Sequence, residues 1–196
     1  MKYKNIIFDF GNVLATFDAD LLLSQFCADE SDRALLKSAI FDNWQALDEG
    51  SIEMSVYIAE AVSKVPPHLI VKVLEYFNSW YKHLTPLTQT WDFIRELKAN
   101  GYHIYILSNA PVQFAENASF YEIVNEFDGI VFSAPIQQFK PESGIYQYLF
   151  DTYHLKPEEC FFIDDKEENI KAGQALGMDG IVFTGNIEEV KKEIDF

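Results

Sequence analysis

The fold is decided by the stretch IIFDFGNVL, residues 6–14. It begins as a short run of large apolar residues and turns polar at Asp9, without the apolar–polar alternation of a half-exposed strand. A continuous apolar run of this kind predicts a strand that is buried on both faces. Similar runs, each ending at a polar or small residue, occur at 103–107, 129–132, 160–163 and 180–183.

Helical patterns lie between these apolar runs. One covers residues 90–100 with Gly101 as its C-terminal cap, another covers 142–153, and a short amphipathic one closes the chain at 186–196. Strands that alternate with helices are typical of an α/β fold with a doubly wound parallel sheet. We therefore expect an α/β protein whose sheet carries helices on both faces.

Residues 15–86 break this alternation. Turn signals at 42–43, 49–51 and 66–67 separate apolar patterns that predict helices and no strand. The expected helices are 19–28, 31–41, 51–64 and 67–83. We therefore predict a small all-helical cap at 15–86, inserted after the first strand, and a core made of residues 1–14 and 87–196.

Composition narrows the possible partners and the cellular setting. With 31 acidic and 15 basic residues the net charge is -16, which disfavours binding to nucleic acid or to an anionic membrane surface. No apolar stretch approaches the roughly 20 residues of a membrane span, and residues 1–8 do not read as a signal peptide. Cys27 and Cys160 lie in apolar surroundings and are interpreted as free thiols, so we expect a cytoplasmic protein. We expect it to be a monomer or a homodimer.

Polar residues follow several of the predicted strands. They are Asp9, the pair Ser108-Asn109, and the pair Asp164-Asp165. In an open parallel sheet ligands bind beyond the carboxyl ends of the strands, so these groups should share one cleft. Neighbouring carboxylates repel each other unless a proton or a cation lies between them, and oxygen ligands suit Mg²⁺. The sequence thus predicts a magnesium site; the alternative is that each acid only caps the helix after it.

Four motifs in this order resemble those of the haloacid dehalogenase-like superfamily. Residues 6–14 resemble its first motif, an apolar strand followed by Asp-x-Asp-x-Thr/Val-Leu, and Leu107-Ser108-Asn109 resembles its second. Lys140-Pro141 resembles the third, and residues 161–165 with Asn169 resemble the acidic fourth motif. The motifs span nearly the whole chain, and the insertion at 15–86 falls where one subclass of the superfamily carries a helical cap.

The resemblance implies a role for each motif. Asp9 would attack phosphorus and form an aspartyl-phosphate, while Ser108 and Lys140 hold the phosphoryl oxygens. A small phosphorylated metabolite would be the substrate and Mg²⁺ the cofactor. The implied metal-site residues are Asp9, the carbonyl of Gly11, Asp164, Asp165 and Asn169. Apart from the resemblance, we expect Asn12, Asn109 and Trp44 to contact the substrate. Asn109 follows Ser108 and would orient the substrate or the cap, and Trp44 lies between predicted cap helices, where it either stacks on a sugar ring or belongs to the core.

Gly11 departs from the usual pattern of the superfamily's phosphatases. Those enzymes carry at this position a second Asp, which protonates the leaving oxygen and activates water. The first motif here resembles instead the Asp-x-Gly-Asn-Val branch, which includes glucose-1-phosphate phosphatases and points to a sugar phosphate. Asp18 or a water held by Asn12 are open replacements for the missing acid. Two further readings stay open: a weakly active or non-catalytic phospho-ligand binding protein, and a dehalogenase-like hydrolase, which the acidic pair Asp164-Asp165 disfavours.

Overall fold

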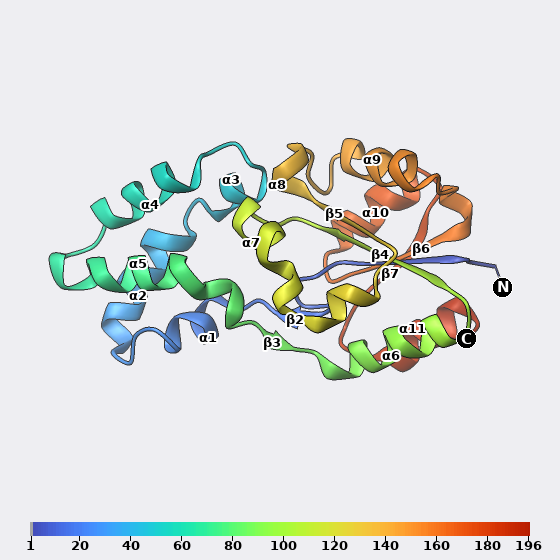
Figure 1. The fold of residues 1–196 in the computed structure, drawn as a ribbon, viewed down its shortest axis with the longest axis horizontal. Coiled ribbons are helices and arrows are strands. Elements are labelled where there is room, and N and C mark those ends of the chain that lie inside the picture. The colour runs from blue at the N-terminus through green and yellow to red at the C-terminus, as the bar shows by residue number, and fades with distance from the viewer. Residues whose placement is uncertain (1) are drawn as a thin grey trace.

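A five-stranded parallel sheet forms the centre of the computed structural model, which describes residues 2–196 (Figure 1). The chain builds the sheet outward from its middle strand, first to one edge and then to the other, which is a doubly wound topology. The strands, in spatial order, are β5 (Gly129–Phe132), β4 (His103–Ser108), β1 (Asn5–Phe8), β6 (Cys160–Asp164) and β7 (Asp179–Val182). The predicted α/β fold class is confirmed.

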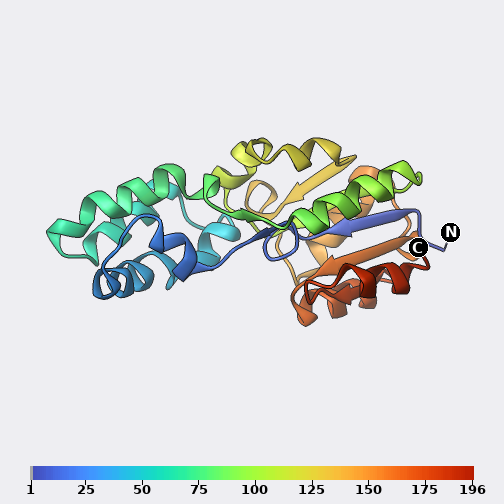
Figure 2. The same ribbon diagram turned by 90° about the horizontal axis from the view of Figure 1, so that it is seen from below.

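Helices cover both faces of the sheet, and the three layers are visible in Figure 2. On one face lie α6 (Thr88–Ala99) and α11 (Ile187–Ile194); on the other lie α9 (Ser143–Tyr153) and α10 (Glu167–Ala175). The middle strand shows why its apolar run is continuous: Ile6 and Phe8 pack into the core on the α6 side, whereas Ile7 packs into the core on the α9 side. Alternate side chains of a strand point to opposite faces, so a strand covered on both faces needs apolar residues at every position.

A second, helical lobe extends from the carboxyl ends of the strands (Figure 1). It contains α1 (Ala19–Ser24), α2 (Glu30–Phe41), α3 (Trp44–Asp48), α4 (Met54–Ser63) and α5 (Ile70–Ser79), with 3₁₀ turns η1 (Pro67–Leu69) and η2 (Trp80–Lys82). Aromatic rings fill its interior: Trp44 stacks on Phe41 with centroids 5.2 Å apart and meets Trp80 edge-on at 5.0 Å.

Two features of this lobe differ from the sequence expectation. The expectation of no strand within 15–86 was wrong at both ends, because β2 (Ala15–Thr16) and β3 (Thr85–Pro86) pair as an antiparallel ribbon. Strands of two residues are too short to show a period. Helix α3 was also overlooked, because one turn between two turn signals reads as loop. We propose that the β2–β3 ribbon marks the boundary between core and cap.

The remaining elements are short connections. They are α7 (Val112–Asn117), η3 (Ala118–Phe120), η4 (Glu122–Glu126), α8 (Ser133–Ile136) and η5 (Pro157–Glu159). Gly101 has a φ of +83° and follows α6, as its predicted capping role requires. Cys27 and Cys160 are both buried free thiols. Within residues 2–196, no helix combines the length and apolarity that a membrane crossing demands.

Candidate active site

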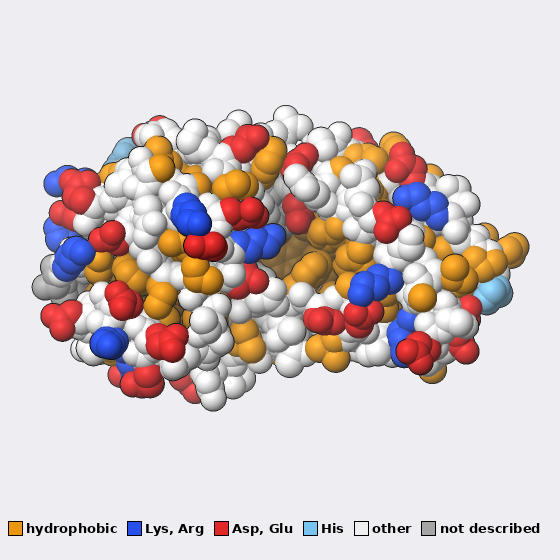
Figure 3. All heavy atoms as spheres, turned by 180° about the vertical axis from the view of Figure 1, so that it is seen from behind, with side chains coloured by type: hydrophobic (Ala, Val, Ile, Leu, Met, Phe, Trp, Pro, Cys, Tyr) orange, Lys and Arg blue, Asp and Glu red, His pale blue; other side chains and the backbone are white. Residues whose placement is uncertain are grey.

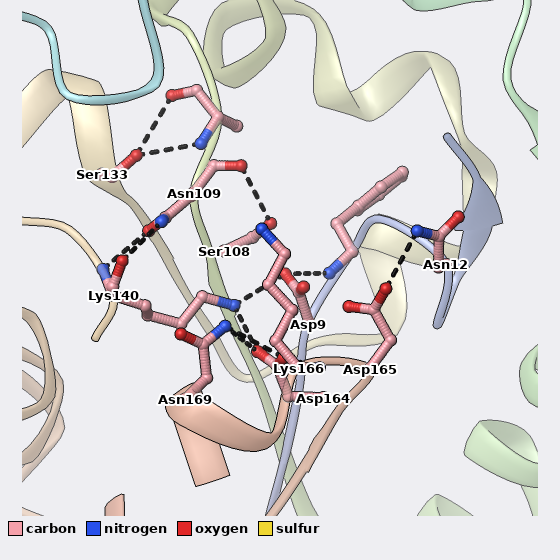
Figure 4. A network of polar contacts seen from close by, with 12 residues as sticks. Asp9, Asn12, Ser108, Asn109, Ser133, Lys140, Asp164, Asp165, Lys166 and Asn169 are labelled. Carbon is pink, nitrogen blue, oxygen red and sulfur yellow. Dashed lines mark hydrogen bonds and ion pairs between the residues drawn. The ribbon is translucent and has the colours of Figure 1, made fainter. Parts of the chain in front are cut away.

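Asp9 lies at the centre of the edge where the strands end. It is the residue after β1, and its amide donates to the Ile163 carbonyl of β6 at 2.9 Å. Ser108 ends β4 and Asp164 ends β6, so the two flanking strands bring both side chains next to Asp9. All three side chains are buried, and Figure 4 shows how they face one another. The sheet thus brings together the groups that the sequence placed at its carboxyl edge.

Lys140 is the cation of this cluster. Its ammonium lies 2.9 Å from an oxygen of Asp9 and 2.7 Å from an oxygen of Asp164, and its side chain is 1% exposed. Burial by itself lowers the pKa of Lys140, but the two carboxylates outweigh it and hold the pKa above the ordinary lysine value. Lys140 therefore carries its charge at neutral pH, next to the carboxylate proposed to attack an anionic substrate.

Burial and the neighbouring charges act in opposite directions on the pKa of the Asp9 carboxyl group. Burial raises its pKa to about 6; the Lys140 charge opposes this rise, the neighbouring Asp164 adds to it, and Ser108 lowers it again. The Phe10 amide donates to the same carboxylate at 2.7 Å. The Lys140 charge and the hydrogen bonds favour the ionised form of Asp9, which is the form able to act as a nucleophile or as a cation ligand.

Hydrogen bonds fix the acidic residues around Asp9. Asp164 accepts from Lys140 at 2.7 Å, from the Lys166 amide at 2.8 Å, and from the Asn169 side chain at 2.9 Å. Asn12, which has a φ of +57°, donates to Asp165 at 3.0 Å while its own oxygen accepts from the Phe17 amide. Asn12 and Asn169 therefore both hold carboxylates in place (Figure 4).

The acidic residues suit a divalent cation. Asp9, Asp164 and Asp165 can each present one carboxylate oxygen such that all three oxygens lie within 4.8 Å of one another. An all-oxygen set with incomplete protein coordination is what Mg²⁺ prefers, because it keeps water and substrate oxygens as further ligands. Gly11 lies in the same cavity wall, and a glycine keeps the backbone carbonyl that the metal role requires.

Asn109 supports Lys140. Its side-chain nitrogen donates to the Lys140 carbonyl at 2.9 Å, and its side-chain oxygen accepts from the Lys140 amide at 2.8 Å. This two-way contact fixes the backbone from which Lys140 projects. Asn109 also lines the cavity, as expected of a residue near the substrate, but both groups of its amide are engaged with Lys140.

A cavity of about 380 Å³ lies above the acidic cluster, between core and cap. Figure 3 shows the hollow, with apolar side chains inside it and charged ones at its rim. The core forms its floor, including Asp9, Ser108 and Lys140. The cap adds an aromatic wall that includes Trp44, which is 8% exposed. All the site residues expected from the sequence line this cavity except Asp164, which lies buried beneath it.

Three residues that the sequence analysis overlooked join the site. Lys166 follows the acidic pair and lines the cavity beside Asp165. Asp48 reaches the cavity from the cap, at the end of α3. Ser133 is buried, accepts from the Ala110 amide at 2.9 Å and donates to the Asp48 carbonyl, so it joins core to cap. Lys166 is adjacent to the fourth motif, and Ser133 directly follows the apolar run at 129–132, so both had a local sequence signal; Asp48 had none.

Comparison with known proteins agrees with this geometry. The family model described as haloacid dehalogenase-like hydrolase matches residues 3–177. The chain belongs to this hydrolase family. It is therefore an enzyme of the class that the four motifs indicated, and the predicted superfamily is confirmed; the glucose-1-phosphate branch within it is not.

Two relatives of this family member match it along most of their length. A sesquiterpene phosphatase, astK, from Aspergillus oryzae is 28% identical over 188 residues, covering 94% of this chain and 92% of the relative. A D-ribitol-5-phosphate phosphatase from Bacteroides thetaiotaomicron is 27% identical over 187 residues, covering 90% and 89%. A HAD family enzyme from the same organism, solved with magnesium and inorganic phosphate, has the same fold with a TM-score of 0.72 and 22% identity over 94% of this chain and 96% of that one.

Proposed function

We propose that this hydrolase is a magnesium-dependent phosphatase that removes the phosphoryl group of a small metabolite through Asp9. The observation that carries the proposal is the position of Asp9. Its carboxylate lies on the cavity floor, 2.9 Å from the buried ammonium of Lys140 and within a cluster of carboxylates suited to a cation. The phosphatase names of both curated relatives support it.

In this mechanism an Asp9 oxygen attacks phosphorus, and the ester oxygen leaves with the bonding electron pair. A water molecule then attacks the aspartyl-phosphate and releases inorganic phosphate. Lys140 and Ser108 lie next to Asp9, where they would bind the phosphoryl oxygens and stabilise the charge that spreads over them in the transition state. Asn109 keeps Lys140 in place through its two contacts with the Lys140 backbone.

A cation would be held by the carboxylates of Asp9, Asp164 and Asp165 and by the Gly11 carbonyl. When bound, it supplies a positive charge that reduces the repulsion between an anionic nucleophile and an anionic substrate. Asn169 and Asn12 would contribute by orienting Asp164 and Asp165.

The substrate class follows from the shape and lining of the cavity. A volume of about 380 Å³ suits a small molecule rather than a phosphoprotein. Trp44 lines the cap wall but is 8% exposed and stacks on Phe41, so it contributes apolar surface there and offers no open ring face. Gln45 and Glu49 add hydrogen-bonding groups to the same wall, which suit the hydroxyl groups of a sugar. We therefore propose sugar phosphates as the first class to test, followed by polyol and isoprenoid phosphates, because the two relatives are named for those substrates.

The test is hydrolysis of p-nitrophenyl phosphate by the wild-type protein with Mg²⁺, with EDTA, and by Asp9→Asn. We expect turnover that requires the metal and falls by at least about 10³-fold in Asp9→Asn, since the nucleophile is lost. Asp42→Asn, which removes an exposed cap carboxylate, is the matched control and should retain full activity. Metal-dependent turnover that survives in Asp9→Asn would rule out the mechanism. Absence of turnover on this ester and on the whole panel would favour a phospho-ligand binding protein.

A further inference from the structure

Glycine at position 11 leaves the active site without an acid–base side chain at the usual place. A positioned acid or base is worth about 10²–10⁴-fold in rate. The other carboxylates near the cavity are therefore candidates to supply the missing proton transfer, and their contacts separate them.

Most of these carboxylates are engaged elsewhere. Asp18 accepts from the Leu21 amide at 2.8 Å as the N-cap of α1, and it is absent from the described residues that line the cavity. Asp165 is held by Asn12 within the acidic cluster. Glu49 accepts from Gln45 at 2.6 Å. Glu168 also lines the cavity, but it belongs to α10 of the core and its side chain is exposed to water. Asp48 is the cap carboxylate that lines the cavity without such a contact.

Asp48 has an unusual environment. Its Oδ1 atom is buried, and within residues 2–196 it has no hydrogen-bond partner. A buried polar atom without a partner costs free energy and therefore points to a missing partner, such as a ligand group.

The backbone around Asp48 is fixed to the core. Ser133 donates to the Asp48 carbonyl, and Gln137 donates to the Gly50 carbonyl at 3.2 Å. Gly50 has a φ of +67°, and a Cβ atom there would lie 2.5 Å from the Ala134 carbonyl oxygen, so only glycine allows this close approach. These contacts hold the end of α3 over the acidic cluster, and the carboxyl group of Asp48 is thus presented to the cavity by a rigid backbone.

The surroundings of Asp48 raise the pKa of its carboxyl group toward neutral pH. Burial raises its pKa to about 7; Lys166 and the Trp44 side chain lower it, Asp9 raises it, and Lys140 lowers it. Burial and, to a smaller extent, the charge of Asp48 raise the pKa values of Tyr57 in α4 and Tyr76 in α5, so both tyrosines are neutral at pH 7. A group that exchanges its proton near neutral pH is suited to act first as an acid and then as a base.

We propose that Asp48, carried by the cap, is the general acid and base that replaces the side chain missing at Gly11. This rests on the proposed phosphatase function. In the first step Asp9 attacks phosphorus, the ester P–O bond breaks, and the leaving oxygen takes the proton of the Asp48 carboxyl group. In the second step the Asp48 carboxylate takes a proton from the attacking water, and the P–O bond to Asp9 breaks with its electron pair returning to Asp9. Phosphate leaves, and Asp48 is protonated again.

The experiment compares Asp48→Asn with the wild type on two esters, p-nitrophenyl phosphate and a simple alkyl phosphate. The aryl leaving group needs no proton, so the variant should still release about one equivalent of nitrophenol in a burst and then turn over about 10²–10⁴-fold more slowly, because water is not activated. On the alkyl phosphate the variant should lose both the burst and the turnover. Asp42→Asn should match the wild type on both esters.

A second-site rescue separates acid–base chemistry from substrate binding. A Cβ atom at Gly11 meets nothing closer than the Phe17 Cβ at 3.7 Å, so the backbone there accepts a side chain, and the superfamily's usual Asp is the one to introduce. Gly11→Asp combined with Asp48→Asn should recover at least tenfold of the lost turnover. A variant whose KM rises while kcat is unchanged, or a double variant without recovery, would overturn the proposal.

The pH dependence of the wild type tests the same idea without any variant. The kcat/KM for the alkyl phosphate should fall as the pH rises above about 7, because the acid form of Asp48 is lost. A profile that stays flat to about pH 9 would overturn the proposal. If the wild type hydrolyses neither ester, the phosphatase function itself fails. If it hydrolyses both through Asp9 and Asp48→Asn is unaffected, only the role of Asp48 fails.

Discussion

The core side of the cavity, its floor, and the cap side, which we call its roof, are stabilised by different kinds of contact. On the floor, buried charged groups satisfy one another: Lys140 contacts Asp9 and Asp164, and Asp164 receives two further donors. The roof consists of aromatic rings from the cap together with Asp48, a half-buried residue whose buried Oδ1 atom has no partner among residues 2–196. The floor is thus preorganised, as the proposed attack of Asp9 on a phosphoryl group requires. The roof can position and protonate what is attached to it, and its position depends on cap–core contacts.

The comparison predicts that loss of the floor's cation has the largest effect. Lys140→Met leaves Asp9 and Asp164 buried without a counter-charge. Breaking a buried ion pair from one side costs about 3–5 kcal/mol, and losing one stabilising group in the transition state costs about 10²–10³-fold in kcat. Urea denaturation at pH 8 and phosphatase assays measure the two effects. Addition of Mg²⁺ should restore part of the stability but little of the activity; unchanged stability in the absence of metal would contradict the ion-pair account.

The roof carboxyl group should make stability depend on pH in a direction opposite to that of a salt-bridged acid. The pKa of Asp48 is raised from 3.8 to about 7 by folding. Between these values the folded protein holds a proton that the unfolded chain has released, so the free energy of unfolding falls as pH rises. Asp48→Asn removes this penalty and should be the more stable protein at pH 8, by at most about 4 kcal/mol.

Denaturant titrations of the two proteins at pH 5 and pH 8, without metal, measure this effect. The stability difference should favour the variant more at pH 8 than at pH 5. An equal difference at both pH values would mean that the Asp48 carboxyl group is not shielded from water. Asp42→Asn serves as the control, because its carboxylate is exposed and should give no such trend.

The contact between floor and roof can be weakened at one residue. Gly50→Ala places a Cβ atom 2.5 Å from the Ala134 carbonyl oxygen, at a φ of +67° that disfavours alanine. We expect a loss of about 1–3 kcal/mol, because strained backbone positions cost this much. We also expect a kcat that falls by several fold while Asp9 still forms the phosphoenzyme. Gly101→Ala, at another positive φ but with nothing within 4 Å, is the matched control for backbone strain alone. An equal loss of kcat in both variants would argue against a specific cap–core contact.

The floor could be predicted well from the sequence, because strand ends are local signals that the sheet brings together in a fixed way. Asp9, Ser108 and the pair Asp164-Asp165 each follow a buried apolar run, and parallel strands place such ends at one edge. Lys140 lies in a loop, and only the resemblance of Lys140-Pro141 to a family motif indicated it. Its pairing with both Asp9 and Asp164 appears in the structure alone.

The roof was harder to predict for a physical reason. Helix α3 is a single turn, too short for a helical period, and it lies between two stretches that resemble turns. Asp48 is therefore one of many acidic residues in a chain with 31 of them, and nothing in its neighbours marks it. The raised pKa of Asp48 depends on its burial beside Trp44. Its position depends on the contact between its backbone and Ser133, which lies 85 positions away.

By itself, the sequence determined the α/β class, the helical insertion, the four motifs and the absence of an acid at Gly11, since each of these is written in neighbouring residues. Tertiary structure decided which carboxylates lie close enough together to share a cation, that the buried Oδ1 atom of Asp48 has no partner among residues 2–196, and which residues of the helical lobe line the cavity. These properties depend on distances between segments far apart in the chain, and the pKa of a buried group depends on all the charges around it. The absence of an acid at Gly11 can be related to Asp48 only because the fold places both residues at one cavity.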